Sequence, residues 1–462
     1  MAEIRYKYAK LPEDILRLEA MGNFSAAEGR IRWLLAKNID QDLRARLEYE
    51  LERIRRIPKD FDVPEEEAIK KLREEFGNHA ITKFEEWISR GYVDYILING
   101  KRYFFRAFID NLLFLCDEEI CKELKRLREK RARSARETLI KHVEEIVQGN
   151  EEGFIKPRKV GVRMTLRVLP NTLEPGEIVR CWLPYPVENE QQGDVKLLGT
   201  SHSQYQIAPS QYYQRTIYFE DKAKEDGSAE FWVEYEYTIK AFYRRINPND
   251  VKPFDEESEL YQRYTSEQPP HVVFTRRYKQ LASEIVGDTE NPYLKAEKIY
   301  RWVAENMTYT YVAEYSTYEN IGEYVAENLR GDCGFHAILF ITLMRISGIP
   351  ARWQSGWYAN PALEGPSPHD WAQFYIEPYG WLFADLSFGR YWRTRNKMLY
   401  EFYFGNIDSF RTVFNLDMMG NFYPPKKYLR SDPVDNQRGE IETEHRNIYY
   451  DRITYELKYK QA

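Results

Sequence analysis

The chain has 462 residues, with 67 lysines and arginines against 73 aspartates and glutamates, so its formal net charge at pH 7 is only −6. This length exceeds what one hydrophobic core usually covers, and about three domains are expected. The near balance of charge argues against a protein that binds nucleic acid through its overall charge. The first ten residues contain no apolar leader, and no stretch is long enough to span a bilayer, so we expect a cytoplasmic protein without membrane association.

Residues 1–155 are expected to form a mainly helical domain with one hairpin. Apolar residues recur at helical spacing, with charged residues opposite them, in four segments: 12–21, 26–37, 43–54 and 64–76. The hairpin is expected at 95–105, where Asn99 and Gly100 suit a type I′ turn. A helix pair followed by a hairpin would also fit a winged helix.

Residues 156–245 change to a period of two. Alternating apolar residues from Val160 to Val168 are followed by further strand-like runs, separated by turn sequences such as EPG and KEDGS. This pattern predicts an antiparallel β-sandwich. Residues 246–272 are rich in Asn, Pro, Asp, Glu and Ser, and we expect a linker or a strap along a cleft.

Four cysteines occur, at 116, 121, 181 and 333. Their spacing is not that of a disulfide scaffold. Cys116 and Cys121 lie in an apolar helical context and Cys181 lies in a strand, so these three are expected to be buried, inert thiols.

The segment GDCGFHA at 331–337 places Cys333 at the start of a predicted helix. Gly331 and Asp332 are breaker and N-cap types, and residues 337–346 are apolar nearly all round, which predicts a helix buried on every side. Gly348 is suited to the left-handed cap that ends it. A helix N-terminus lowers the pKa of a thiol and offers N–H groups to an oxyanion, so Cys333 is a candidate nucleophile.

His369 and Asp385 are the candidate partners of this thiol. His369 opens a strand expected at 371–376, and Asp385 ends a second strand expected at 381–385. If a regular four-residue turn joined the strands, the two side chains would lie on opposite faces of the sheet.

The turn between these strands contains Pro378 and Gly380. These residues favour a three-residue hairpin with a G1 bulge at Gly380, in which Glu377 faces Trp381. In that register His369 and Asp385 are expected on the same face of the sheet.

Four motifs carry a family resemblance: GDCGFHA, SGIPARWQSGW at 347–357, HDWAQFYI and WLFADLSFG. In this order they resemble the core of the transglutaminase-like superfamily, which is papain-like in fold. The resemblance implies an α+β multidomain protein. Its core at 273–400 would pack a buried Cys-bearing helix against an antiparallel sheet, after a helical domain and a β-sandwich. It also implies Cys333 as nucleophile, His369 as general base and acid, and Asp385 as the carboxylate that holds the imidazole tautomer.

The reaction that the resemblance implies is attack of the thiolate on an amide of a peptide or protein, giving a thioester on Cys333. Water would resolve it in a peptidase, amidase or deamidase, whereas an amine acceptor would make the enzyme a transamidase. The alternative is a scaffold or binding module that has lost turnover. We expect no cofactor and no metal, and the acidic clusters of a calcium site are not recognisable.

Other residues near the motifs are weaker candidates. Tyr309 and Tyr311 are candidate oxyanion donors by location, and Trp357 and Trp371 are candidate walls of the cleft. His336 lies one turn after the cysteine, where the helix N-terminus disfavours an imidazolium, so a structural or substrate-contacting role is preferred. A metal site formed by Cys333, His336 and His369 has no supporting CxxC or HExxH spacing.

Asp332 and Asp370 flank the nucleophile and the base. They are placed to tune both groups electrostatically, but we prefer an N-cap role for Asp332 and a loop or strand-edge carboxylate for Asp370. Residues 401–462 are expected to form a β-rich extension whose final strand, at 447–460, closes the core sheet.

Overall fold

The computed structural model describes residues 9–131, 133–149 and 151–460. The chain divides into two compact units. The first unit comprises Met1–Arg131 and Thr308–Glu319, and the second comprises Ala132–Met307 and Asn320–Ala462. Residues 308–319, expected within the core at 273–400, therefore belong to the first unit.

The first unit is mainly helical, as expected. Its helices are α1 (Glu13–Ala20), α2 (Phe24–Leu35), α3 (Gln41–Asp60), α4 (Glu65–Phe76), α5 (His79–Ser89), α6 (Phe108–Leu115) and α7 (Glu119–Arg131). A three-stranded sheet has the order β1-β3-β2, from β1 (Val63–Pro64), β2 (Tyr95–Ile98) and β3 (Lys101–Phe104). Asn99 and Gly100 join β2 to β3 with φ angles of 49° and 84°, as the expected turn requires.

Cys116 and Cys121 form a disulfide, with their Cα atoms 6.0 Å apart. The expectation of two inert thiols here was wrong, because the chain turns between α6 and α7 and brings two residues only five positions apart face to face. Cys181 is buried as expected, and burial raises the pKa of its thiol.

The second unit contains the predicted sandwich of two antiparallel sheets. One sheet has the order β18-β17-β5-β8-β7 and the other β19-β4-β9-β6. Their strands are β4 (Gly153–Val168), β5 (Ile178–Pro184), β6 (Gln192–Thr200), β7 (Gln206–Ile207), β8 (Thr216–Lys222), β9 (Ala229–Tyr243), β17 (Glu440–Thr443), β18 (Asn447–Ile448) and β19 (Ile453–Tyr459).

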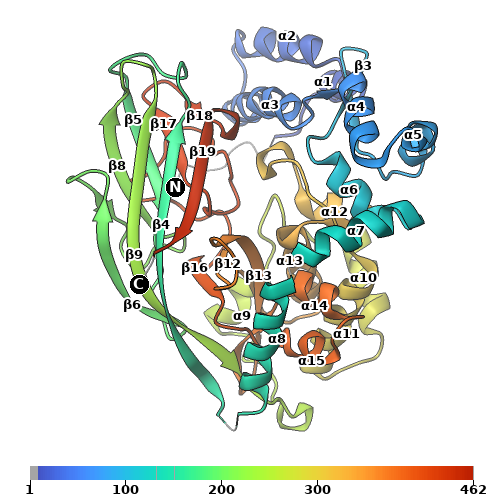
Figure 1. The fold of residues 1–462 in the computed structure, drawn as a ribbon, viewed down its shortest axis with the longest axis vertical. Helices are drawn as coiled ribbons and strands as arrows, with labels where there is room; N and C mark the ends of the chain where they lie inside the picture. Colours follow the sequence, from blue (N-terminus) through green and yellow to red (C-terminus); the bar gives the residue numbers. More distant parts are fainter. Residues whose placement is uncertain (1–8, 132, 150, 461–462) are drawn as a thin grey trace. The chain divides into compact units, whose positions relative to one another are not determined.

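The last strands of the chain complete this sandwich. β17 pairs with β5 and β19 pairs with β4, and Figure 1 shows these red strands beside the green ones. The final strand therefore does not close the core sheet as expected, because its alternating residues pair along β4 instead. The core sheet gains two earlier strands of the extension, β15 (Phe404–Gly405) and β16 (Arg411–Asn415).

The core sheet has the order β15-β14-β13-β12-β16. Its central strands are β12 (Ala351–Tyr358), β13 (Ser367–Ile376) and β14 (Gly380–Ala384). The accompanying helices are α8 (Arg133–Val147), α9 (Glu259–Tyr264), α10 (Arg276–Val286), α11 (Pro292–Asn306), α12 (Ile321–Asn328), α13 (Cys333–Ile346), α14 (Leu386–Trp392) and α15 (Lys397–Phe402). α13 packs against β12 and β13 on one side and against α10, α11, α12 and α14 on the others, which explains its largely apolar sequence.

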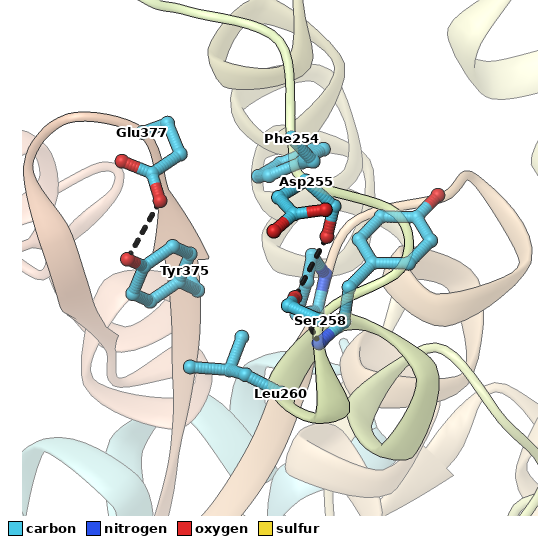
Figure 2. Close-up of a pocket in the computed structure, with 8 residues that line it drawn as sticks. Phe254, Asp255, Ser258, Leu260, Tyr375 and Glu377 are labelled. Carbon is cyan, nitrogen blue, oxygen red and sulfur yellow. Dashed lines mark hydrogen bonds between the residues drawn. The ribbon is translucent and has the colours of Figure 1, made fainter.

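The expected strap at 246–272 is held against α13. Arg345 of this helix is buried and donates hydrogen bonds to the carbonyl oxygen of Ser266 at 2.9 Å and to Oε1 of Gln268 at 3.2 Å. A cavity of about 210 Å³ lies between the strap and the end of β13, and Figure 2 shows Tyr375 and Glu377 facing Ser258 across it. Tyr375 is six residues along β13 from His369, or about 20 Å. The cavity is therefore separate from the candidate partners of Cys333.

We expect the protein, denatured without reductant, to show two reactive thiols, those of Cys181 and Cys333. Reduction before denaturation should raise the count to the four cysteines of the sequence. Titration with a chromogenic disulfide reagent measures both values. The variant Cys121→Ser should gain one thiol without reduction, and four thiols in the unreduced wild type would contradict the disulfide.

Candidate active site

Cys333 begins helix α13, whose two ends are formed as the sequence predicts. Oδ1 of Asp332 accepts a hydrogen bond from the backbone N–H of Phe335 at 3.2 Å, so Asp332 is the N-cap. Gly348 follows the other end with a φ of 74°, the left-handed conformation expected there. Residues 334–345 are all buried, whereas Cys333 is partly exposed. Cys333 thus lies at the less buried, N-terminal end of this helix.

The register of the β13–β14 hairpin decides whether the candidate base, His369, and its candidate carboxylate, Asp385, lie on the same face of the sheet. Gly380 has the expected positive φ, 79°, but it pairs with Ile376, and the register runs regularly from there to the pair of Ala372 with Ala384. The expected pairing of Glu377 with Trp381 was therefore wrong by two residues, and no bulge interrupts this register. The loop still has three residues, but the pair that closes it is Ile376 with Gly380 instead of Glu377 with Trp381. His369 and Asp385 therefore still share a face of the sheet, and the end of β14 lies nearer to His369.

His369 and Asp385 are brought together by this register. Nε2 of His369 lies 2.7 Å from Oδ2 of Asp385. Asp385 also caps α14, because its Oδ1 accepts a hydrogen bond from the backbone N–H of Phe388 at 3.0 Å. Burial acts to raise the pKa of Asp385, but His369 and Arg411 outweigh it and lower that pKa to about 2. An ionised Asp385 holds the proton of the imidazole on Nε2 and leaves Nδ1 as the basic nitrogen.

Arg411 completes this arrangement and was missed by the sequence analysis. Its guanidinium is fully buried and contacts Oδ2 of Asp385 and Oδ2 of Asp408, each at 2.8 Å. Four aromatic rings have centroids within 6 Å of it: those of Tyr358, Trp371, Phe388 and Tyr403. The sequence did contain a signal, which was an arginine in the apolar run of β16. A buried cation requires a paired anion, so such an arginine indicates a buried ion pair.

The thiol of Cys333 donates a hydrogen bond to Oδ2 of Asp370 at 3.2 Å. Burial, Asp370 and Asp332 all raise the pKa of this thiol well above its ordinary value. This direction is opposite to the lowering expected from the helix N-terminus, because burial and two neighbouring carboxyl groups disfavour the thiolate.

Asp370 belongs to a buried polar network, so the expectation of a simple strand-edge carboxylate was wrong. Its Oδ1 accepts a hydrogen bond from Nε2 of Gln437, which also donates to Oδ2 of Asp435 at 2.7 Å. Ser355 of β12 donates its hydroxyl to the same oxygen of Asp435, and Asn415 of β16 donates to that hydroxyl at 3.0 Å. Burial, Asp435 and Asp332 raise the pKa of Asp370 well above its ordinary value.

The two candidate tryptophans are fully buried and hold parts of this site in place. Nε1 of Trp371 donates to Oε1 of Gln354 at 2.6 Å, and its ring lies 5.9 Å from that of His369. Nε1 of Trp357 donates to the carbonyl oxygen of Gln437 at 2.8 Å. Trp357 therefore positions the segment that contacts Asp370.

His336 is a neutral, buried side chain one helical turn after Cys333. Nδ1 of its ring lies 2.7 Å from the carbonyl oxygen of Asp332. Burial lowers its pKa to about 4, so it does not supply an imidazolium for the thiolate near neutral pH. In the part of the chain that the structure describes, no group of three or more His, Cys, Asp or Glu side chains is arranged to hold a metal ion.

Tyr309 and Tyr311 belong to the first unit, whereas Cys333, His369 and Asp385 belong to the second. Both tyrosines pack around Phe114, with ring centroids 5.4 Å and 5.9 Å away. Their role as oxyanion donors stays a prediction.

Comparison with known proteins identifies the region around these residues. Residues 279–386 match the family described as the transglutaminase-like superfamily. An uncharacterised protein of Haemophilus influenzae is 22% identical over 293 residues, which cover 55% of this chain and 78% of that protein.

Two solved structures match parts of the chain. A candidate cysteine protease from Cytophaga hutchinsonii is 17% identical with a TM-score of 0.42, covering 66% of this chain and 94% of that one. The periplasmic domain of TgpA from Pseudomonas aeruginosa is 13% identical with a TM-score of 0.28, covering 51% of this chain and 97% of that domain.

The depressed pKa of Asp385 should make stability depend on pH in the acid range. A folded-state pKa of about 2, against an ordinary value of 3.8, contributes about 2 kcal/mol, fully present above pH 4 and lost as pH falls towards 2. Urea unfolding of wild type and Asp385→Asn across this range measures the effect. The variant should lose less stability on acidification than wild type, and equal losses would contradict the assignment.

Proposed function

We propose that this protein, whose residues 279–386 form a domain of the transglutaminase-like superfamily, performs acyl transfer on an amide of a peptide or protein through a thioester on Cys333. The observation that carries the proposal is the 2.7 Å contact between Nε2 of His369 and Oδ2 of Asp385. The next residue of β13 after His369 is Asp370, and its carboxyl contacts the thiol of Cys333. A thiol, an imidazole and a buried carboxylate are the groups that this chemistry requires.

The proposed mechanism begins with the neutral thiol of the resting site. Nδ1 of His369 takes the thiol proton, and Asp385 stabilises the resulting imidazolium through Nε2. The thiolate attacks the amide carbon, the C–N bond breaks, and the leaving amine receives the proton from Nδ1. Water or a second amine then attacks the thioester and releases Cys333.

A binding module without turnover is the alternative. The ion pairs of Arg411 with Asp385 and Asp408 support an enzyme instead, because fully buried charges are often no more stable than apolar residues of similar size. Their most direct use is to keep Asp385 ionised beside His369.

The cytoplasmic location stays a prediction. Among the residues that the structure describes, no helix is long and apolar enough to cross a membrane. The disulfide between Cys116 and Cys121 favours an oxidising compartment over the cytoplasm, where thiols are kept reduced.

Alkylation by iodoacetamide near neutral pH tests the proposed thiol–imidazole pair without a substrate. We expect Cys333 to be labelled in native wild type and His369→Ala to slow this labelling at least about tenfold, because the thiol loses its proton acceptor. Peptide mass spectrometry identifies the labelled cysteine. His445→Ala is the matched control, since it removes an exposed histidine of the same unit and should leave the rate unchanged.

Trapping the acyl group tests the reaction itself. Wild type, quenched in acid during incubation with a peptide amide pool, should carry an acyl mass on Cys333, and Cys333→Ala should carry none. In the alkylation experiment, a rate of iodoacetamide labelling that is the same in wild type and in His369→Ala would overturn the proposed mechanism.

A further inference from the structure

We propose that Asp408 is a positioning residue of the candidate active site: its negative charge offsets that of the Arg411 guanidinium, so that the other carboxylate beside this guanidinium stabilises the imidazolium of His369. The other carboxylate is that of Asp385. Asp408 itself lies in the loop between β15 and β16 and contacts the guanidinium. This inference rests on the proposed function, in which His369 takes the proton of the thiol.

The first support is that the imidazole and the guanidinium contact the same carboxylate oxygen. Oδ2 of Asp385 lies 2.7 Å from Nε2 of His369 and 2.8 Å from Nη1 of Arg411, whose side chain is fully buried. A cation beside this oxygen opposes protonation of the imidazole, because two positive charges would then share one negative charge. Arg411 alone would therefore make His369 a weaker base.

The second support is the carboxylate on the other branch of the guanidinium. Nη2 of Arg411 donates a hydrogen bond to Oδ2 of Asp408 at 2.8 Å, and both side chains are fully buried. Tyr403 donates its hydroxyl to the same oxygen at 2.9 Å, and the backbone N–H of Phe410 donates to Oδ1 at 2.7 Å. Three donors, one of them a cation, favour the ionised carboxylate. Burial acts to raise the pKa of Asp408, but Arg411 outweighs it and that pKa is lowered.

The charges of these buried groups balance only when the imidazole carries a proton. Two ionised carboxylates and one guanidinium leave a single negative charge, which an imidazolium neutralises. Without the charge of Asp408 the same groups are already neutral, and protonation of His369 would leave an uncompensated positive charge in a buried setting. Asp408 therefore makes uptake of the proton by His369 the charge-balanced state.

Aromatic rings enclose the imidazole and the guanidinium together. The ring of Phe388 has its centroid 4.9 Å from that of His369 and 4.8 Å from the guanidinium carbon of Arg411. The rings of Tyr358 and Trp371 also lie near both groups. Rings at these distances leave little room for water, so the charges of the imidazole and the guanidinium are screened less than charges at a surface.

The titratable groups that adjoin Asp408 from other elements do not alter this balance near neutral pH. Burial lowers the pKa of His142 in α8, so its imidazole is uncharged. Burial raises the pKa of Tyr358 in β12 and of Tyr403 after α15, so both hydroxyls keep their protons. The other titratable or charged groups near the cluster are the same in every variant below, and they are Tyr300 of α11, His336 of α13, Asp370 of β13 and Arg158 of β4.

The proposed step moves one proton and conserves it. Nδ1 of His369 takes the proton of the Cys333 thiol, which leaves a thiolate on the sulfur and completes the charge balance around Arg411. The thiolate forms the C–S bond, the C–N bond of the amide breaks, and Nδ1 gives the same proton to the leaving amine. Asp408 keeps its charge throughout.

Two variants with opposite expected shifts test this charge balance. In Asp408→Asn the imidazolium loses a counter-charge, so the pH at which half of His369 is protonated should fall by about one pH unit, the effect of a unit charge roughly 10 Å away in a shielded site. In Arg411→Met two carboxylates and no guanidinium face the imidazole, so the same midpoint should rise. NMR spectra of protein labelled with nitrogen-15 in histidine measure the midpoint, and His369→Gln identifies the signal among the seven histidines.

A double variant and a surface variant are the controls. Asp408→Asn combined with Arg411→Met returns the single negative charge to Asp385, so its midpoint should lie between those of the two single variants. Asp288→Asn removes an exposed carboxyl of the same unit and should leave the midpoint unchanged. Thermal unfolding checks the fold of each variant.

A midpoint that is unchanged in Asp408→Asn, or that moves in the same direction in both single variants, would overturn the inference, because loosening of the site alone moves both alike. If Asp408→Asn does not fold, the double variant replaces it. Its midpoint should then lie below that of Arg411→Met, since the two differ by the charge of Asp408, and equal midpoints would overturn the inference.

The midpoint is measured without a substrate, so its result is separate from that of the proposed function. Unshifted midpoints together with slower labelling in His369→Ala reject only the role of Asp408. Shifted midpoints together with unchanged labelling in His369→Ala reject the proposed function and leave the charge balance around Arg411 standing.

Discussion

The buried guanidinium of Arg411 is the constraint on which the arrangement around His369 depends. It lies between two carboxylates, and one of them, Asp385, directly follows β14 while Arg411 itself opens β16. In the sheet order these strands are separated by β13 and β12, so the ion pair spans most of the sheet. An unpaired charge at this depth would cost several kcal/mol, and the pairing therefore fixes both the fold of the extension and the orientation of the imidazole.

Burial alone does not set the charge of the carboxyl groups near Cys333. Asp385 and Asp370 are both buried, yet the pKa is lowered for Asp385 and raised for Asp370. The difference lies in their neighbours, because Asp385 meets an imidazole and a guanidinium, whereas Asp370 meets Asp435 and Asp332. Neighbouring charges therefore decide the direction in which burial moves each of these two carboxyl pKa values.

Local patterns predicted the elements that carry the site. The apolar run after Cys333, the caps at Asp332 and Gly348, and the turn glycine at 380 each reflect short-range chemistry, and the helix, its caps and the positive φ were predicted correctly. The register of the hairpin was wrong by two residues because loop closure depends on the paired strands as well as on the turn. Arg411, Asp435 and Gln437 were missed because their importance arises from contacts between segments far apart in the chain.

The position of Gln437 in the chain has a consequence for how the protein is made. Gln437 lies 67 positions after Asp370, and the strand that follows it, β17, pairs with β5 of the sandwich. During synthesis Cys333, His369 and Asp385 all leave the ribosome before Asp435 and Gln437, the two residues that adjoin Asp370. The thiol of Cys333 therefore acquires its full surroundings only when the late strands of the sandwich have paired, which couples the environment of this thiol to completion of the fold.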